Sequence, residues 1–260
     1  MSFRFTGNGG FSLGATNFPY PPNIILEYPF TLSCWFFPTD NATNQDLILL
    51  QTATDYWWIN LRGDLAGDPM RAVTFNSTTS TTTANPTVSN AVIFNQWNHV
   101  TANFVSNTSR FISVNGAART QGTTNSNQGA PVNPDVIIGG YQGGGTRPFN
   151  GYIAHVAIWN DQIRDAENAT LGRGASPLKT KPTRLMAYWP MVNPGQQYNT
   201  SSVRGRAYSL PLSGSIYARY SNWNPPVKLA LPQQTKIALA SAQNNAPIFY
   251  HQRQQQGMAA

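Results

Sequence analysis

Carboxylates are the first residues to consider, because Asp and Glu supply the acid and base of glycan hydrolysis. The sequence of 260 residues contains 10 of them. Glycan-cleaving enzymes built on β-sheets place two carboxylates two or four residues apart, so that both point from one face of a strand. The two glutamates, Glu27 and Glu167, are instead far apart on different elements. The carboxylates therefore predict a protein that is not an enzyme.

Asp64 and Asp68 are the candidate ligands for a metal ion. They flank the tripeptide Leu-Ala-Gly, and their carboxylate oxygens are the type of ligand that calcium prefers. Asp is also frequent in turns next to glycine, and a turn is expected after the strand predicted at 56–61. Both interpretations stay open, and calcium is the one cofactor that the sequence suggests.

The histidines and the cysteine are predicted to be structural. His99 and His155 lie on predicted strands beside large apolar residues, and Cys34 lies within an apolar strand. The sequence shows neither the Cys and His spacing of a zinc site nor the Ser, His and Asp residues of a nucleophilic triad. We therefore expect the two histidines to be bonded within the sheets and Cys34 to act as a small buried apolar residue.

Aromatic residues are the candidate contacts for carbohydrate. The candidates that could stack on sugar rings, if their side chains are exposed, are Tyr56, Trp57, Trp58 and Tyr141. Trp57 and Trp58 are adjacent, so on a strand one of the two indoles faces outward. An exposed indole serves either as a ligand platform or as an anchor in a protein interface. The sequence leaves this choice open.

The elements that must position these residues are short strands. The segment Phe30–Phe37 alternates apolar residues on one face with Thr31, Ser33 and Trp35 on the other. Similar strands are predicted at Asp46–Gln51, Tyr56–Leu61, Ala72–Asn76, Asn98–Val105, Arg110–Asn115, Asp135–Gly139, Tyr152–Asn160 and Leu185–Pro190. A helix is predicted at Asp165–Leu171, a loop at 121–134, and either a loop or weak edge strands at 76–90. This pattern predicts an all-β protein, an antiparallel two-sheet sandwich or jelly roll with one short helix.

Positive charge is concentrated in the later part of the chain. The formal net charge is +7, and no Asp or Glu follows Glu167. After Asn224–Pro226 the chain becomes rich in Ala and Gln, so we divide it into a sandwich domain, 1–226, and an extended C-terminal arm, 227–260. Such an arm becomes ordered on a partner surface. Its predicted partner-binding residues are Lys228, Lys236, Phe249, Tyr250 and Arg253. Because these charges are dispersed, we expect a protein partner and not nucleic acid.

The N-terminal segment and the cysteine content indicate where the protein is made. No apolar segment typical of a secretory signal follows Met1, and no apolar run approaches the roughly 20 residues that span a bilayer. The single cysteine excludes an internal disulfide. We therefore expect assembly in the cytoplasm of a host cell, without membrane attachment.

Several segments resemble motifs of laminin-G-like, concanavalin A-like jelly-roll domains, and they occur in the family's order. They are Phe30–Trp35, Trp97–Val100, Arg110–Gly116, Phe149–Asn160, Ile163–Glu167, and Leu185–Pro190 with Asn224–Pro226. The resemblance covers residues 30–226 and implies the jelly-roll fold, with strands that return after the short helix. Two positions depart from the family pattern, since Ala154-His155 replaces an acidic pair and Arg164 replaces the usual Ser or Thr before the helix. The resemblance therefore implies the fold but little about ligand chemistry.

The sandwich and the basic arm together resemble bacteriophage structural proteins. We expect a non-enzymatic virion component, a phage capsid decoration or cement protein whose arm docks on the shell while the lectin-like sandwich faces outward. The expected partners are the major capsid protein or other virion proteins, together with further copies of the chain in a homo-oligomer. The alternative is a carbohydrate-binding, lectin-like module of a tail fibre or cell-surface adhesin, with a host glycan as its ligand.

Overall fold

The computed structural model describes residues 3–6, 10–13, 26–79, 81–82, 86–140, 147–191 and 212–213. The chain divides into two units, Met1–Val227 and Lys228–Ala260, and every described residue belongs to the first. The partner-binding residues predicted in the arm, and Tyr141, lie outside the described residues. Within the described part of the chain, no helix combines the length and apolar character needed to span a bilayer.

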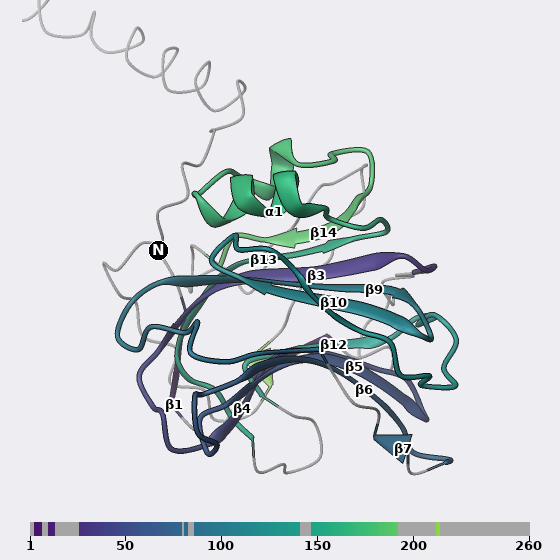
Figure 1. The fold of residues 1–260 in the computed structure, drawn as a ribbon, viewed down its shortest axis with the longest axis horizontal. Helices are drawn as coiled ribbons and strands as arrows, with labels where there is room; N and C mark the ends of the chain where they lie inside the picture. Colours follow the sequence, from purple (N-terminus) through teal and green to yellow (C-terminus); the bar gives the residue numbers. More distant parts are fainter. Residues whose placement is uncertain are drawn as a thin grey trace, which may run out of the picture. The chain divides into compact units, whose positions relative to one another are not determined.

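One antiparallel sheet contains seven strands in the described part of the chain. They are β1 (Phe3–Thr6), β3 (Phe30–Pro38), β9 (Asn98–Ser106), β10 (Ser109–Val114), β11 (Thr120–Gly122), β13 (Asn150–Trp159) and β14 (Leu185–Trp189). Their order is β1-β13-β3-β9-β10-β11, and β14 also pairs with β13. This sheet forms the upper layer of strands in Figure 1.

The second antiparallel sheet contains eight described strands. They are β2 (Gly10–Leu13), β4 (Asn44–Gln51), β5 (Asp55–Arg62), β6 (Met70–Asn76), β7 (Thr81–Thr82), β8 (Thr87–Val88), β12 (Asp135–Ile138) and β15 (Leu212–Ser213). Their order is β15-β2-β12-β4-β5-β6-β7, and β8 also pairs with β6. Strands that follow one another in the chain, such as β3 and β4, often belong to different sheets. The prediction of a two-sheet antiparallel jelly-roll sandwich is therefore confirmed.

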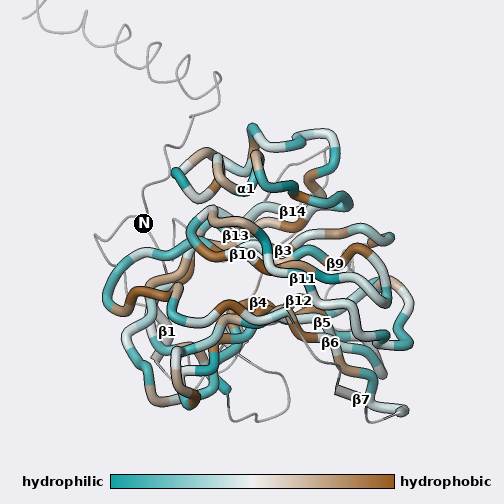
Figure 2. Tube along the Cα trace, in the orientation of Figure 1, coloured by the Kyte–Doolittle hydropathy of each residue, from teal (hydrophilic) through white to brown (hydrophobic). Residues whose placement is uncertain are grey.

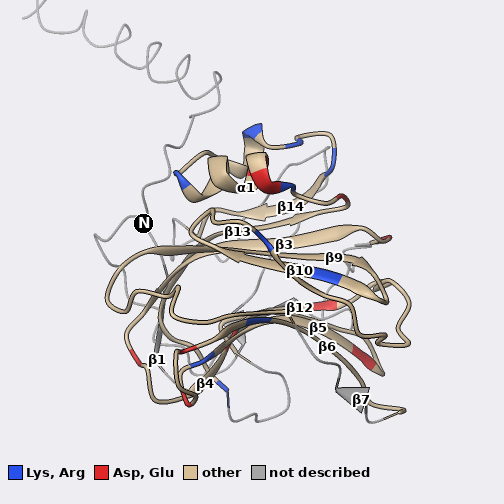
Figure 3. Cartoon of the chain, in the orientation of Figure 1, with Lys and Arg blue, Asp and Glu red and all other residues tan. Residues whose placement is uncertain are grey.

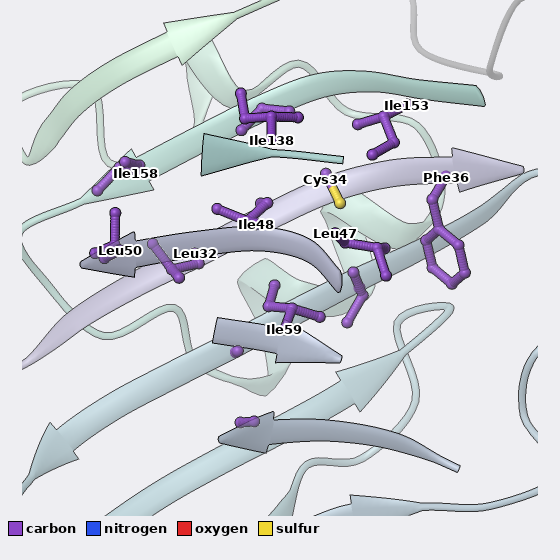
Figure 4. Packing of buried hydrophobic residues seen from close by; sticks show 14 of the residues in the cluster. Leu32, Cys34, Phe36, Leu47, Ile48, Leu50, Ile59, Ile138, Ile153 and Ile158 are labelled. Atoms are coloured by element: carbon purple, nitrogen blue, oxygen red, sulfur yellow. The ribbon is translucent and has the colours of Figure 1, made fainter. Parts of the chain in front are cut away.

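The hydrophobic core fills the space between the two sheets. Leu32, Cys34 and Phe36 of β3 have no exposed surface, and Ile48 and Ile59 meet them from the other sheet (Figure 4). Figure 2 shows that hydrophobic residues gather along the strands of both sheets, whereas the connecting segments are mostly polar. Complete burial of an aliphatic or Phe side chain contributes about 1.5–3 kcal/mol. The alternation predicted for β3 and the burial of Cys34 are thus both confirmed.

Helix α1 (Asp165–Gly172) covers the outer face of the seven-stranded sheet. The helix begins where the backbone N–H of Arg164 donates a 2.8 Å hydrogen bond to the carboxylate of Glu167. This bond is the half of a capping box that the third helical residue provides, and it does not require a Ser or Thr at position 164. Ile163 and Leu171 then pack with Trp159 and other residues of the sheet. The 3₁₀ helix at Pro177–Lys179 lies between α1 and β14 in the chain.

The predicted strands agree with the observed strands to within about two residues at each end. The strands β1 and β2 were not predicted, because they are short and the glycine-rich start of the chain interrupts their pattern. The segment predicted as a loop at 121–134 contains the end of β11. The short strands β7 and β8 lie within 76–90, in agreement with the alternative of weak edge strands there. These additions extend the edges of the sheets and leave the predicted architecture unchanged.

Candidate functional site

The outer face of the eight-stranded sheet, which is turned away from the core, combines aromatic and polar side chains. Alternation along β5 directs Trp57 and Ile59 into the core and Trp58 and Asn60 outward. Cross-strand pairs extend this face to β4, β6 and β12. The members of the outer face are Asp46, Leu49, Gln51, Tyr56, Trp58, Asn60, Arg62, Arg71, Val73, Phe75, Asp135 and Ile137.

The centre of the outer face is an apolar row that crosses four strands. Ile137 pairs with Leu49, Leu49 with Trp58, and Trp58 with Val73. These four residues form a cluster of their own, separate from the main core. The guanidinium of Arg147 lies 5.4 Å from the centroid of the Trp58 ring, in a cation–π contact. The row therefore fixes the position of the Trp58 indole on this face.

Asp46 is a buried carboxylate at one end of the outer face. Its Oδ1 atom accepts a 2.9 Å hydrogen bond from the Asn60 amide, and its Oδ2 atom lies 3.2 Å from Nε of Arg147. Burial raises the pKa of Asp46 to about 6, although Arg147 and Asn60 each favour the charged form. Asp46 therefore holds Arg147 and Asn60 in place between the sheet and solvent.

Arg62 and Arg71 lie on the same face with different surroundings. Arg62 makes two hydrogen bonds to Asp64, of 2.6 and 2.7 Å. Arg71, opposite Asn60 on the next strand, takes part in no ion pair among the described residues, and its Nε atom is buried without a hydrogen-bond partner. Burial and the charge of Arg62 both lower the pKa of Arg71. Figure 3 shows that basic and acidic positions are interspersed around β4 in this sheet.

The groups of the outer face are suited to binding. Tyr56, Gln51, Phe75, Arg71 and Arg147 are half-buried, so each presents part of its side chain to solvent. Guanidinium, amide and hydroxyl groups bond polar ligands, and aromatic rings pack against apolar ligand surfaces. Strands of a sheet hold these groups rigidly, which favours a preformed site.

The prediction of an exposed indole at Trp57 or Trp58 is wrong. Trp57 is 1 % exposed and lies in the core, where its Nε1 atom donates a 3.3 Å hydrogen bond to the hydroxyl of Tyr28. Trp58 does face outward, as the alternation required, but it is 6 % exposed. The reason is that β5 is an inner strand, so Leu49 and Val73 flank the Trp58 ring. Trp58 is therefore part of the outer face without being an open platform.

The candidate calcium ligands lie in the turn after β5. Asp64 is bonded to Arg62, and the backbone N–H of Asp68 bonds the carbonyl of Leu65. Asp68 has a φ of 44°, a conformation that suits Asp in a turn. Among the described residues, no group of three or more His, Cys, Asp or Glu is placed to bind a metal ion. Calcium binding at this turn stays a prediction.

His99 and His155 are buried and bonded on the outer face of the seven-stranded sheet. The Nε2 atom of His99 lies 2.8 Å from Oγ of Ser33, and the Nδ1 atom of His155 lies 2.6 Å from the hydroxyl of Tyr188. Burial lowers the pKa of His99 to about 3 and that of His155 to about 4, so both are neutral at pH 7. The prediction of structural histidines is confirmed.

Sequence reasoning missed the polar part of the outer face. Tyr56 is among the predicted aromatic contacts, whereas Asn60 was missed, although it alternates with core residues in the predicted strand at 56–61. Arg71 precedes the strand predicted at 72–76 by one residue. Arg147 gave no signal, because only the tertiary structure brings the loop before β13 against Asp46.

Comparison with solved structures identifies a similar fold in a carbohydrate-binding module. The CBM40 module of a Ruminococcus gnavus IT-sialidase is 16 % identical, covers 66 % of this chain and 97 % of its own, and has a TM-score of 0.50. The same module bound to α2,3-sialyllactose is 18 % identical, with 66 % and 96 % coverage and a TM-score of 0.50. Domains LG4–5 of the mouse laminin α1 chain are 14 % identical, with a TM-score of 0.46. That match covers 60 % of this chain and 40 % of the laminin chain.

Comparison of the sequence with family models gives the same assignment. A comparison with curated proteins found no match. The model described as the concanavalin A-like lectin/glucanases superfamily matches residues 6–167, which is more than half of the chain. The chain therefore belongs to the concanavalin A-like lectin/glucanases superfamily.

Proposed function

We propose that this protein is a lectin-like, carbohydrate-binding module without enzymatic activity, and that its glycan contacts the outer face of the eight-stranded sheet. One observation supports this most directly. Aromatic, amide and guanidinium groups lie in register on one face of β4, β5 and β6, and several of them are partly exposed. A sugar has both apolar ring faces and hydroxyl groups, so it requires this combination of side chains.

The carboxylates of the described residues favour binding over hydrolysis. A retaining glycosidase needs two carboxyl groups about 5–5.5 Å apart, and an inverting enzyme about 6.5–9.5 Å apart. On the outer face, Asp46 is fully buried and bonded. Asp135 pairs with Gln51, on the other side of the apolar row from Asp46. Glu167 belongs to the helix that covers the other sheet. No pair of these residues resembles an acid and a nucleophile at a sugar.

The comparisons support the proposal at the level of fold. The Ruminococcus gnavus module, which has been observed bound to sialyllactose, shares the two-sheet architecture over 66 % of this chain. Sequence identity of 18 % does not transfer its ligand to this chain. The ligand must therefore be argued from the side chains of this protein.

The virion hypothesis stays a prediction from the sequence. It depends on the arm at 227–260, which lies outside the described residues. No feature of the described residues favours a capsid shell as partner, whereas the outer face favours a glycan. The two roles are compatible, since a virion component can bind host glycans.

A matched pair of tyrosines tests the proposed function. Tyr56 and Tyr152 are both half-buried on outer sheet faces, and each packs against a Phe ring, with centroids 5.7 and 5.6 Å apart. The full chain is screened on a glycan array, and the affinity for the best ligand is measured by calorimetry. We expect Tyr56→Ala to weaken binding about tenfold, in the range typical of a side chain worth 1.4 kcal/mol. Tyr152→Ala, on the other sheet, should change it less than twofold.

Two results would contradict the proposal. The first is the absence of binding to any glycan on the array. The second is an equal loss of affinity in the Tyr56→Ala and Tyr152→Ala variants, since this would indicate a general loss of folding. Urea unfolding of both variants separates that effect from a loss of contact.

A further inference from the structure

We infer that the glycan bound by the outer face bears a carboxylate, and that Arg71 is the residue that receives it. This inference rests on the proposed function and specifies the chemical class of the ligand. It predicts an acidic sugar, such as a sialic or uronic acid unit, at the end of the face formed by Arg71, Asn60 and Trp58.

The arginines of the outer face differ in their ion pairs. Asp64 is bonded to Arg62, and Asp46 is bonded to Asn60 and paired with Arg147. Arg71 differs from Arg62 and Arg147, because no ion pair among the described residues includes it. Arg71 therefore carries a positive charge without an ion-pair partner among the described residues, and the carboxylate of Asp64, which is paired with Arg62, acts on it only at longer range.

Two hydrogen-bond donors near Arg71 have no partner. The Nε atom of Arg71 and the Nε1 atom of Trp58 are both buried without a hydrogen-bond partner. Buried donors in folded proteins are normally bonded, so each such group calls for an explanation. Val73, the cross-strand partner of Trp58, is two residues from Arg71 and on the same side of β6. The Trp58 and Arg71 donors therefore belong to neighbouring positions of the face. Neither atom has accessible surface, so an oxygen-rich ligand would satisfy both of them once the side chains that cover them shift.

The shape and burial of the Arg71 guanidinium suit a carboxylate. The planar fork of an arginine side chain fits a carboxylate through two parallel hydrogen bonds. A half-buried guanidinium also binds an anion more strongly than an exposed one, because water screens the pair less. Arg71 is half-buried, and its neighbour across the strand, Asn60, is buried and fixed by Asp46. The position thus favours a carboxylate over a neutral hydroxyl group.

The Gln51 side chain marks the opposite end of the same face. Its Oε1 atom is buried without a hydrogen-bond partner, and Gln51 pairs with Tyr56. Tyr56 and Asn60 are four residues apart on β5, which is about 13 Å along a strand. The donors near Arg71 and the acceptor at Gln51 would therefore orient an acidic glycan with its carboxylate toward Arg71.

The test compares two ligands that differ by one acidic sugar. The full chain is titrated with α2,3-sialyllactose and with lactose, and the ratio of the two affinities is the readout. A second pair, a galacturonic acid oligomer and the corresponding galactose oligomer, separates carboxylate recognition from recognition of sialic acid alone. We expect the acidic member of at least one pair to bind at least tenfold more tightly, and raised salt to reduce this preference.

Three variants assign the effect to Arg71. Arg71→Gln should reduce the acidic-to-neutral ratio to near one, with less than threefold change for the neutral ligand. Arg71→Lys should give an intermediate ratio, because it keeps the charge and loses the fork. Arg173→Gln is the control, since Arg173 is exposed just beyond helix α1 on the other sheet, and it should leave the ratio unchanged.

The outcomes separate this inference from the proposed function. Equal or tighter binding of the neutral ligands would overturn the carboxylate class and leave the glycan-binding function intact. A preference that persists in Arg71→Gln, or a sulfated glycan that binds more tightly than both acidic sugars, would also overturn the inference. Failure to bind any glycan would overturn both. Should Arg71→Gln unfold more easily, the ligand pairs measured on the unmodified chain still decide the ligand class.

Discussion

The Nδ2 atom of Asn168, in helix α1, donates a hydrogen bond of 2.7 Å to the Oγ atom of Ser113, in β10. The same nitrogen donates a second bond, of 3.0 Å, to the carbonyl of Ala117. Asn168 has no exposed surface, and the sheet beneath it presents polar residues such as Thr31 and Asn103. Helix α1 is therefore attached to the sheet by buried hydrogen bonds as well as by the apolar side chains of Ile163 and Leu171.

Replacing Asn168 should loosen this helix. Asn168→Ala removes both bonds and leaves Ser113 Oγ without its donor, whereas the Ala117 carbonyl keeps a 2.6 Å bond from the Ser113 hydroxyl. We expect a loss of about 2 kcal/mol in the free energy of unfolding. Urea unfolding measures this loss, and faster amide exchange in α1 should accompany it. Thr170→Ala, at an exposed position of the same helix, should cost less than about 0.5 kcal/mol. Equal losses in the two variants would show that the buried bonds contribute nothing specific.

Two glycines provide a test of close backbone packing. A Cβ atom on Gly151 would lie 2.0 Å from the carbonyl oxygen of Phe37, and Gly151 has a φ of 142°. Gly151→Ala therefore requires β13 and β3 to move apart, and we expect it to destabilise the protein by at least about 3 kcal/mol. At Gly129 a Cβ would meet nothing within 4 Å. Gly129→Ala should change stability by less than about 1 kcal/mol. Similar thermal midpoints for the two variants would contradict the close approach.

Acid should destabilise the protein before its exposed carboxylates titrate. The pKa values of His99 and His155 are lowered by burial to about 3 and about 4, whereas unfolded histidines titrate near 6.5. The unfolded state therefore binds two more protons, and stability falls as the pH falls. Burial raises the pKa of Asp46 to about 6, so near pH 5 the folded state binds a proton there that the unfolded state does not. This proton offsets one of the two protons taken up by the unfolded histidines. The net loss is about 1.4 kcal/mol per pH unit near pH 5.

The Asp46→Asn variant tests the sign of each contribution. Without the opposing titration of Asp46, the two histidines should give about 2.7 kcal/mol per pH unit near pH 5. Urea unfolding, monitored by tryptophan fluorescence at about pH 6.0, 5.0 and 4.5, gives the change in the free energy of unfolding per pH unit for each protein. A slope that is unchanged in the variant would show that Asp46 does not titrate in this range.

The thiol of Cys34 should report on global unfolding. Cys34 is the single cysteine of the chain, has no exposed surface, and burial raises its pKa. A thiol reagent should therefore react with it only through opened molecules, at least about a thousandfold more slowly than in urea-unfolded protein. The labelling rate is measured in native buffer and across the unfolding transition. Rapid labelling in native buffer would place Cys34 outside the closed core.

The sequence was sufficient to predict the sandwich, because its evidence is local. In β3, apolar residues at every second position require one buried face, whichever strands become its neighbours. The same reasoning correctly assigned Cys34, His99 and His155 to buried positions. The short helix at 165–171 was also predicted from its own residues, and it extends to Gly172 in the structure.

The proposed binding face could not be predicted from local sequence patterns alone. Alternation along β5 shows that Trp57 and Trp58 point to opposite sides, but not which side is the core or how closely the neighbours cover each ring. Only the packing of β4 and β6 beside β5 places Leu49 and Val73 against Trp58.

The pairing of charged side chains depends on long-range contacts more than any other feature of this face. The sequence determined that the chain folds as a lectin-like β-sandwich with few carboxylates. The tertiary structure decided which charges are paired, because Arg147 reaches Asp46 from about 100 residues away in the chain and Arg71 is left without such a partner among the described residues. Strand alternation acts between adjacent residues, whereas ion pairing depends on the meeting of distant segments, so only the folded chain points to Arg71 as the residue proposed to bind the ligand.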